Sequence, residues 1–372
     1  MIQSDSSPLV TAVVLSYNKQ SYLRSQLAYY AHKPIHLVLA DGSGTDWGHG
    51  SNGRIGQMTW EYFRMSGSET FFERLSEACQ RVTTKNMFFL DDEDCTLWTG
   101  VVRATAFLQA NPDYCSAGGS VAYTTATKKR LGITTNSLYS PFQSSEDSDL
   151  QRVTKVLTMR KTGHLYYQVH RSETVKSWAR CSMGLSPKIG LGFGEPAFAS
   201  VLSASGKWKS DLYPYSLRRQ FAGVVTIPKT ARTTHLTVTN ATDLANRVYE
   251  ALSETQYRTT QTSIVSSQEI RDALIRHCGS PRKTKPTTNQ KIREFIVKKV
   301  LLNVFDYFPQ LYQQLRPSGI RTIQQYSKLN DSVDTSSEIL SDLSAVEKLW
   351  LAYPQGLSQV EFEHCLADGA IT

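Results

Sequence analysis

The sequence has little of what marks several common classes of protein. Its 372 residues include six cysteines, and no two of them form a Cys-x-x-Cys pair. That spacing favours neither a structural zinc site nor a dense disulfide framework. No window approaches the ~18 uninterrupted apolar residues of a membrane-spanning helix, and the first residues lack the basic segment of a signal peptide. These absences predict a cytoplasmic protein with reduced cysteines.

A strong excess of one charge is also lacking, because 41 basic residues face 33 acidic ones and the net charge is only +8. The exception is the segment 281–299, where seven basic residues accompany the single acid Glu294. A predicted helix over 289–316 overlaps it and carries a dense apolar set. This helix could pack within a helical domain, against a second subunit of a homo-oligomer, or on an anionic membrane surface. It does not predict sequence-specific binding of nucleic acid.

What the first half does contain is an alternation of short apolar runs and longer amphipathic segments. The apolar runs predict strands at 10–16, 35–40, 58–63 and 87–90. The amphipathic segments predict helices at 19–32, 69–82 and 99–110. Such alternation predicts an α/β fold with a mostly parallel sheet and helices on both faces.

The second half changes character at about residue 239. Helices at 173–179 and 195–204 and a strand at 224–228 still continue the α/β pattern, and residues 124–152 are polar enough to predict a long surface loop. From there on, only helices are predicted, at 241–253, 268–278, 289–316 and 336–351. We therefore predict two domains: an α/β domain over 1–235 and a mainly helical C-terminal domain over 236–372.

Polar clusters follow three of the predicted strands at their carboxyl ends. They are Ser16-Tyr17-Asn18, Asp41-Gly42-Ser43 and Asp91-Asp92-Glu93-Asp94. Ligands of open α/β sheets bind outside the carboxyl ends of the strands. The three clusters are therefore expected to lie together at one edge of the sheet and to form a binding site.

The acidic cluster predicts a cation. Neighbouring carboxylates repel one another unless a positive charge lies between them, and oxygen ligands suit Mg²⁺ or Mn²⁺, which also bind phosphate oxygens. Asp92 and Asp94 point to the same side of an extended chain, and Asp91 with Glu93 is the alternative pair. A solvated acidic turn is the simpler explanation of the same residues. His235 could complete a metal site.

Three further residues have both a functional and a structural interpretation. Asp41 could hold a ribose hydroxyl or a base N–H, or could merely form a turn. Glu195, after a glycine-rich run, could act as a general base, or could simply favour the start of a helix. Arg218 or its neighbour Arg219 could bind a diphosphate, or could lie on the surface.

Taken together, these motifs resemble those of the GT-A-fold glycosyltransferases, most closely the large family 2-like group. The resemblance covers roughly residues 8–230. Four segments carry it, namely Val-Thr-Ala-Val-Val-Leu-Ser-Tyr-Asn (10–18), Leu-Val-Leu-Ala-Asp-Gly-Ser (37–43), Phe-Phe-Leu-Asp-Asp-Glu-Asp (88–94) and Gly-Phe-Gly-Glu (192–195). It implies a Rossmann-like catalytic domain that binds a nucleoside-diphosphate sugar.

The resemblance also implies roles for individual residues. Asp92 and Asp94 would hold Mn²⁺ or Mg²⁺ on the donor diphosphate, and Glu195 would activate an acceptor hydroxyl of a glycan or lipid-linked sugar. The implied nucleotide-sugar contacts are Ser16, Tyr17, Asn18, Asp41, Asp91, Asp92 and Arg218. Two features depart from the family pattern: the metal motif is longer than a simple Asp-x-Asp, and Glu195 is followed by Pro196 rather than by a second acid.

Two other functions remain open from the sequence. A nucleotidyltransferase that makes sugar nucleotides normally has a glycine-rich phosphate loop after its first strand, whereas residues 16–20 contain no glycine. A basic adaptor could bind a membrane or nucleic acid through 281–316, but this would leave the acidic cluster unexplained. We predict an inverting, metal-dependent sugar transfer in glycan biosynthesis, because it accounts for most of the motifs. It would take place at the cytoplasmic face of the membrane if the basic helix docks there.

Overall fold

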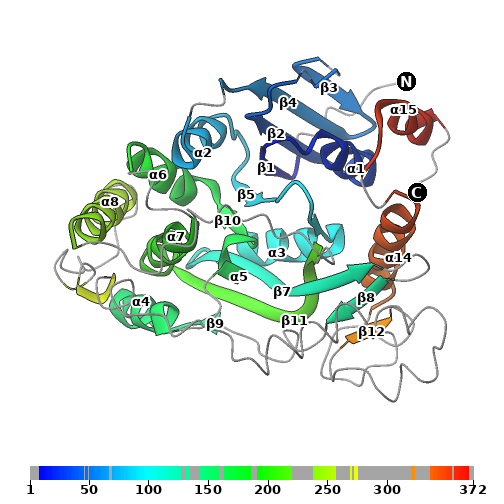
Figure 1. Ribbon diagram of the computed structural model, residues 1–372. Coiled ribbons are helices and arrows are strands. Elements are labelled where there is room, and N and C mark those ends of the chain that lie inside the picture. Colours follow the sequence, from blue (N-terminus) through cyan, green and yellow to red (C-terminus); the bar gives the residue numbers. More distant parts are fainter. Residues whose placement is uncertain are drawn as a thin grey trace, which may run out of the picture.

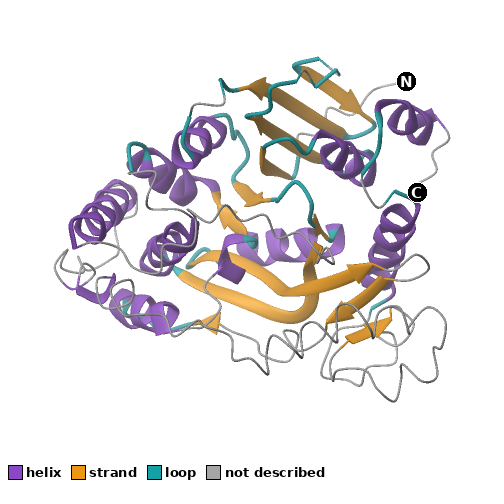
Figure 2. Ribbon diagram, in the orientation of Figure 1, coloured by secondary structure: helices purple, strands orange, loops and turns teal. Residues whose placement is uncertain are grey.

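The computed structural model describes residues 8–45, 47–48, 50–66, 69–126, 131–134, 143–158, 163–185, 191–219, 238–256, 269, 272–274, 320–322, 336–353 and 356–367. Its centre is a mixed β-sheet with the main strand order β12-β8-β7-β10-β5-β1-β2-β4-β3, which helices cover on both sides (Figure 1). Figure 2 shows the same arrangement by type of element. The predicted α/β class is therefore confirmed.

The parallel part of the sheet is formed by the strands predicted from the apolar runs: β1 (Val10–Ser16), β2 (Ile35–Asp41), β4 (Met58–Arg64) and β5 (Asn86–Phe89). The other strands are β3 (Asn52–Ile55), β6 (Cys95–Thr96), β7 (Tyr114–Ala126), β8 (Leu131–Thr134), β9 (Gln143–Ser144), β10 (Val169–Arg171), β11 (Lys207–Arg219) and β12 (Ile320–Thr322). Strand β10 is antiparallel to β5 and to β7, so the sheet changes from parallel to mixed beyond β5.

The helices fall into two groups, one on each face of the sheet. The first group is α2 (Phe71–Gln80), α4 (Asp149–Thr158), α5 (Gly163–Tyr166), α6 (Ser172–Ser182), α7 (Leu191–Ser205) and α8 (Val238–Gln256). The second is α1 (Gln20–Tyr30), α3 (Trp98–Ala110), α14 (Ser337–Ala352) and α15 (Gln359–Ala367). Alternate residues of β1 belong to the two cores, since Val13 packs with the first group and Ala12 and Val14 with the second.

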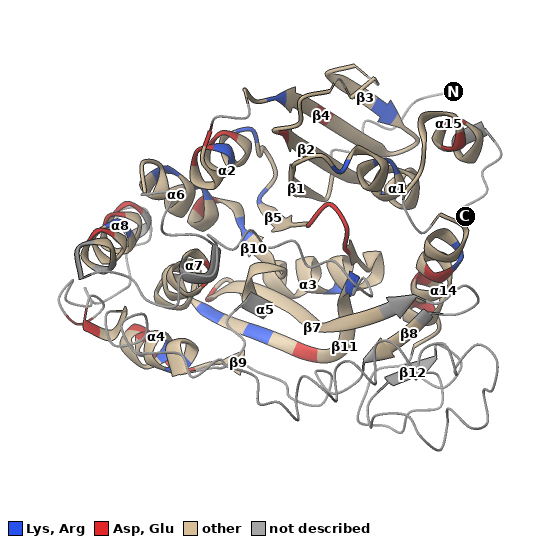
Figure 3. Ribbon diagram, viewed as in Figure 1, with Lys and Arg blue, Asp and Glu red and all other residues tan. Residues whose placement is uncertain are grey.

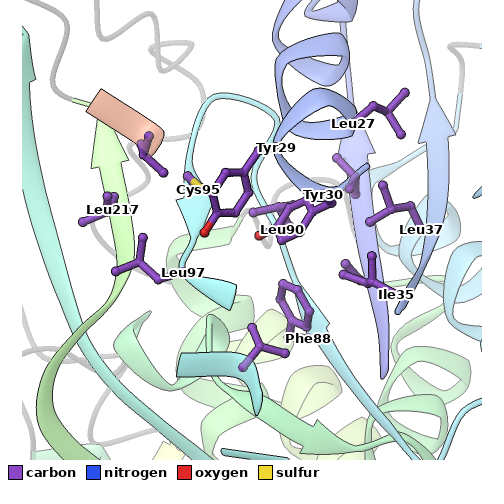
Figure 4. Packing of buried hydrophobic residues seen from close by; sticks show 14 of the residues in the cluster. Leu27, Tyr29, Tyr30, Ile35, Leu37, Phe88, Leu90, Cys95, Leu97 and Leu217 are labelled. Carbon is purple, nitrogen blue, oxygen red and sulfur yellow. The ribbon is translucent and has the colours of Figure 1, made fainter. Parts of the chain in front are cut away.

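The second core explains why helices from both ends of the chain lie together. Figure 4 shows Leu27 and Tyr30 of α1 in the same apolar cluster as Ile35 of β2 and Phe88 of β5. Helix α14 adds an apolar stripe with helical spacing to the same cluster, namely Ile339, Leu343, Val346, Leu349 and Trp350. The described C-terminal helices therefore pack on the α/β sheet. The boundary predicted near 235 lies outside the described residues and stays a prediction.

Several elements differ from the sequence-based prediction. Residues 124–152, predicted as one loop, include the end of β7, all of β8 and β9 and the start of α4. Helix α7 begins at Leu191, so Glu195 lies within it rather than at its start, and Pro196 follows inside the helix. The predicted strand at 224–228 and helix at 289–316 lie outside the described residues. Among those that are described, no helix combines the length and apolar character needed to cross a membrane.

Candidate active site

The three polar clusters lie at one edge of the sheet, as predicted. Ser16, the last residue of β1, pairs in register with Asp41, the last residue of β2. Strand β5 lies on the other side of β1, and the acidic cluster follows it as the red loop at the centre of Figure 3. Because parallel strands end at the same edge, the order of the strands alone brings these residues together.

Asp41 is fully buried and holds the loop that follows β2. Its Oδ1 atom accepts hydrogen bonds from the backbone N–H and the hydroxyl of Ser43, and its Oδ2 atom accepts from Gln20 and Tyr62 at 3.1 and 3.2 Å. Ser43 in turn accepts from the N–H of Asn18, which has a φ of 57°. Asp41 thus ties the ends of β1 and β2 together. Its predicted contact with the nucleotide stays a prediction.

The acidic loop is held in shape by a residue that the sequence did not reveal. Gln26 of α1 donates from its Nε2 atom to the carbonyl oxygens of Asp91 and Asp94, and the N–H of Asp94 donates to the carbonyl of Asp91 at 3.2 Å. The loop is therefore a closed turn, not an extended strand end. For that reason, alternation along an extended chain does not determine which carboxylates converge.

The four carboxylates have different partners. Glu93 forms an ion pair with Lys19, and Asp92 accepts from the hydroxyl of Ser16 at 3.2 Å and from the N–H of Tyr17. Asp91 accepts from the phenol of Tyr167 at 2.7 Å. The remaining partner is a guanidinium that lies between Asp91 and Asp94.

That guanidinium belongs to Arg218, at the end of β11. Its Nε atom lies 3.0 Å from Oδ2 of Asp94, one of its terminal nitrogens lies 3.2 Å from Oδ2 of Asp91, and it stacks over the ring of Tyr167. Burial alone would lower the pKa of Arg218, but the charges of Tyr167, Asp94 and Asp91 raise it above its usual value. Of the two sequence interpretations of Arg218, the structure thus supports a position at the site rather than on the open surface.

Arg219 connects the acidic loop with the C-terminal helix α14. Its backbone N–H donates to Oδ1 of Asp94 at 3.0 Å, and its guanidinium lies over the rings of Tyr22 and Trp350. Burial lowers the pKa of Arg219 to about 10. Helix α14 is therefore part of the wall of this site.

Burial changes the ionisation of the acidic loop. Burial, and next the charge of Asp91, raise the pKa of Asp92 from 3.8 to about 7. The same two causes raise the pKa of Asp94 to about 7, although Arg218 and the N–H of Arg219 favour its charged form. The loop therefore contains carboxylates whose negative charge destabilises the fold until a cation or donor group compensates it.

The shift at Asp92 predicts a pH-dependent effect on stability. The stability that comes from a neutral Asp92 is fully present below about pH 4 and is lost as the pH rises through about 7. Asp92→Asn stays neutral, so in EDTA its melting temperature should exceed that of the wild type at pH 8, on the order of 2–4 °C. The difference should shrink towards pH 5.

Differential scanning calorimetry between pH 5 and 8 measures this effect. The matched control is Asp113→Asn, because Asp113 is a surface carboxylate that pairs with Lys207 at 3.2 Å. An Asp92→Asn curve that runs parallel to the wild-type curve over the whole pH range would contradict the raised pKa.

Glu195 interacts electrostatically with two tyrosines, and one of these, Tyr167, contacts the acidic loop. Its charge is among the causes that raise the pKa values of Tyr166 and Tyr167, after burial and Asp91, and the phenol of Tyr167 donates to Asp91. Its neighbour Gly194 packs against Phe72 of α2, where an added Cβ would lie 3.0 Å from the ring. The structure thus places Glu195 on the side of the site formed by α5 and α7, and its role as general base stays a prediction.

Two other carboxylates, Asp147 and Asp149, lie in the polar segment 124–152 and could act as the base in place of Glu195. Asp147 pairs with Lys207, the first residue of β11, at 3.0 Å, whereas Arg218 lies near the opposite end of that strand. At about 3.3 Å per residue, the eleven steps from Lys207 to Arg218 correspond to roughly 36 Å along the strand. Asp149, in the first turn of α4, lies two residues after Asp147. The printed contacts thus join Asp147 to the start of β11, whereas Arg218 near its end contacts the acidic loop. The choice of base among Glu195, Asp147 and Asp149 stays a prediction.

Arg74 of α2 is a further basic residue that the sequence did not indicate. Its guanidinium lies over the ring of Tyr17, and a Cβ added to Gly42 would lie 2.5 Å from it. Its Nε atom is buried without a hydrogen-bond partner in the part of the chain that the structure describes. Arg74 thus lies beside two of the three polar clusters, where it could donate to an anionic ligand.

The carboxylates of the loop suit a metal ion whose other coordination positions are filled by substrate or water. Within the described ranges, no group of three or more His, Cys, Asp or Glu side chains converges to hold a metal, and His235 lies outside those ranges. However, a single cationic group already contacts one oxygen each of Asp91 and Asp94. Mg²⁺ in particular is often bound by one or two carboxylates together with phosphates and water.

Comparisons with known proteins find similarity in structure only. No family model matches the sequence, and no curated protein matches it. The structure is similar to that of S. aureus TarS, at 13% identity and a TM-score of 0.41, over 82% of this chain and 50% of that one. It is also similar to TarS 1-349 in complex with UDP-GlcNAc, at 12% identity and a TM-score of 0.44, over 94% and 93% of the two chains.

A third similar structure is the mannosyltransferase PcManGT from Pyrobaculum calidifontis in complex with GDP-Man and Mn²⁺. The identity is 12% and the TM-score is 0.38, over 84% of each chain. At these values the similarity concerns the arrangement of elements, and it assigns no residue of this chain to a role. The functional argument therefore depends on the site itself.

Proposed function

We propose that this chain is a glycosyltransferase that moves a sugar from a nucleoside-diphosphate sugar to a hydroxyl of a glycan or glycolipid. The observation that carries the proposal is the acidic loop at the carboxyl edge of the parallel strands, next to the Ser16–Asn18 cluster. Its carboxylates can neutralise a diphosphate only through a cation, and Arg218 and Arg74 are nearby guanidinium groups of the kind that bind phosphate. This combination suits a donor that carries a diphosphate leaving group.

The proposed reaction is a single displacement with inversion at the sugar. A divalent ion, Mn²⁺ or Mg²⁺, held by Asp94 with Asp92 or Asp91 and completed by His235 if that residue reaches the site, would neutralise charge on the departing diphosphate. Glu195 accepts the proton of the acceptor hydroxyl. The acceptor oxygen forms its bond to the anomeric carbon as the bond from that carbon to the diphosphate breaks, and the electron pair leaves with the diphosphate.

A screen of nucleotide sugars tests the proposal directly. The full chain is heated with each of several nucleotide sugars, with and without Mn²⁺, and the melting temperature is measured. At least one donor should stabilise the fold, by about 2.7 kcal/mol at one hundred times its Kd, and slow hydrolysis should release the nucleoside diphosphate. Release of pyrophosphate from a nucleoside triphosphate and a sugar phosphate would instead indicate a nucleotidyltransferase.

The location of the acceptor is a second part of the proposal. The basic segment 281–299 and the apolar helix predicted over 289–316 lie outside the described residues, so the support comes from the sequence. We infer a cytoplasmic enzyme that binds the anionic inner face of a membrane, where a lipid-linked acceptor would be available. Packing of the same helix against a second subunit of a homo-oligomer is the competing arrangement.

Flotation with anionic liposomes distinguishes the two. The wild type should float at low salt and less at high salt, because each basic residue near the surface contributes about 1 kcal/mol. Changing Lys291, Arg293, Lys298 and Lys299 to Gln should abolish flotation. A control with the same loss of charge changes Lys33, Lys85, Lys155 and Lys348 to Gln. Equal flotation of the two variants, or no flotation of the wild type, would contradict membrane binding.

A further inference from the structure

Arg218 lies where the acidic loop needs a cation. It contacts Oδ2 of Asp94 and Oδ2 of Asp91, and that same Asp91 oxygen also accepts a hydrogen bond from the Tyr167 hydroxyl. The side chain of Asp94 is only 6% exposed, and that of Arg218 is 33% exposed. Arg218 is therefore the counter-ion that Asp91 and Asp94 share in this structure.

The contacts also determine which carboxylates converge. Asp92 is turned towards Ser16 and the N–H of Tyr17, and Glu93 towards Lys19. Only Asp91 and Asp94 share a cationic partner, because the turn closed by Gln26 brings these two side chains to one side. The sequence had paired Asp92 with Asp94, or Asp91 with Glu93.

A divalent cation and the guanidinium cannot both occupy this position. A divalent cation held by Asp91 and Asp94 would compete with Arg218, which contacts the same two carboxylates, because two positive charges side by side repel strongly in a partly buried site. We propose that Arg218 and a divalent cation are alternative counter-ions of Asp91 and Asp94, so that metal binding displaces the Arg218 guanidinium from the acidic loop. One consequence rests on the proposed function: the released guanidinium would then be available to bind the donor diphosphate.

The test measures metal binding directly, without nucleotide. Mn²⁺ is titrated into the full chain, and the free ion is measured by electron paramagnetic resonance. Arg218→Gln removes the competing counter-ion, so its Kd for Mn²⁺ should be at least about tenfold lower than that of the wild type. Arg218→Lys keeps the charge but loses the bidentate contact, and its Kd should lie between the two.

Arg219→Gln is the matched control. It removes one positive charge from the adjacent position, yet it keeps the backbone N–H that donates to Asp94. A general effect of charge would tighten Mn²⁺ binding equally in both variants, whereas displacement of Arg218 predicts a distinctly larger gain for Arg218→Gln. Asp91→Asn in the Arg218→Gln background should reverse that gain.

A thermal measurement covers the case of a poorly folded variant. Arg218→Gln should melt below the wild type in EDTA, because Asp91 and Asp94 lose their counter-ion, and Mn²⁺ should restore most of the difference. Equal Mn²⁺ affinity of the wild type and Arg218→Gln, or no Mn²⁺ binding by Arg218→Gln, would overturn the proposal. If Arg218→Gln binds Mn²⁺ more tightly while no nucleotide sugar binds the wild type, the counter-ion exchange stands and the proposed function fails.

Discussion

Asp94→Asn is expected to weaken Mn²⁺-dependent binding of a nucleoside diphosphate by at least about a hundredfold, or about 2.8 kcal/mol. Asp92→Asn should have the same effect if Asp92, rather than Asp91, is the second carboxylate that holds the ion. The physical reason is that a neutral amide cannot hold a divalent cation against a diphosphate as a carboxylate does. Isothermal titration of the full chain with UDP and GDP, in the presence and absence of Mn²⁺, measures the effect. The alanine variants at the two positions should lose binding in the same way.

The asparagine variants make the interpretation cleaner than the alanine variants. Removing one partner of a buried ion pair costs about 3–5 kcal/mol when the other charge is left uncompensated. In Asp94→Asn, Arg218 keeps its contact with Asp91, so the expected loss of stability is smaller and the fold should survive. Circular dichroism confirms the fold, and Asp147→Asn, in an exposed residue paired with Lys207, is the control. Wild-type affinity in both Asp94→Asn and Asp92→Asn would rule out the metal assignment.

Glu195→Gln is expected to lower kcat by about 10²–10⁴-fold, the usual contribution of a general base, while leaving the Kd of the donor nearly unchanged. The reason is that the proposed role of Glu195 is at the acceptor hydroxyl, whereas the proposed role of the acidic loop is to hold the cation that neutralises the diphosphate. Single-turnover measurements with a saturating donor separate the two quantities.

The control for Glu195 is a glutamate of the neighbouring helix α6. Glu173 is exposed and pairs with Lys176 at 3.5 Å, so Glu173→Gln should change neither kcat nor donor affinity. A Glu195→Gln enzyme with near-normal turnover would exclude Glu195 as the base. A parallel loss of donor affinity would instead indicate that Glu195 positions Tyr167 and Asp91.

The elements that the sequence predicted well are those with a strong local pattern. The apolar runs at β1, β2 and β5 are buried on both faces, so they contain almost no polar interruption, whereas β4 alternates buried with half-buried residues. Helix α2 begins with the capping box Thr70–Glu73, a signal that local side-chain hydrogen bonds fully explain. In α2 these stabilising bonds are between residues close in the sequence. The strands pair with distant segments, since β1 lies between β2 and β5, but their apolar runs are a local pattern that suffices to predict them.

The missed elements have patterns that only their neighbours explain. Strand β7 contains Gly118-Gly119, which reads as a turn, but a Cβ at Gly119 would lie 2.6 Å from the carbonyl oxygen of Tyr213. The glycines are there because β11 approaches closely. Strand β11 alternates Tyr213, Tyr215 and Leu217 with other residues, a signal of period two. Pro214 and its irregular register weaken that signal.

The amino-acid sequence by itself determined the α/β class, the strands that carry the polar clusters and the edge at which those clusters meet, because periodicity and parallel strand order suffice for these. Only the tertiary structure decided which carboxylates converge and what neutralises them. Arg218 is 124 residues from Asp94 and 127 from Asp91, and Trp350 of α14 lies against Arg219 from still further along the chain. Contacts at such separations depend on the packing of whole elements, and no local pattern of residues encodes them.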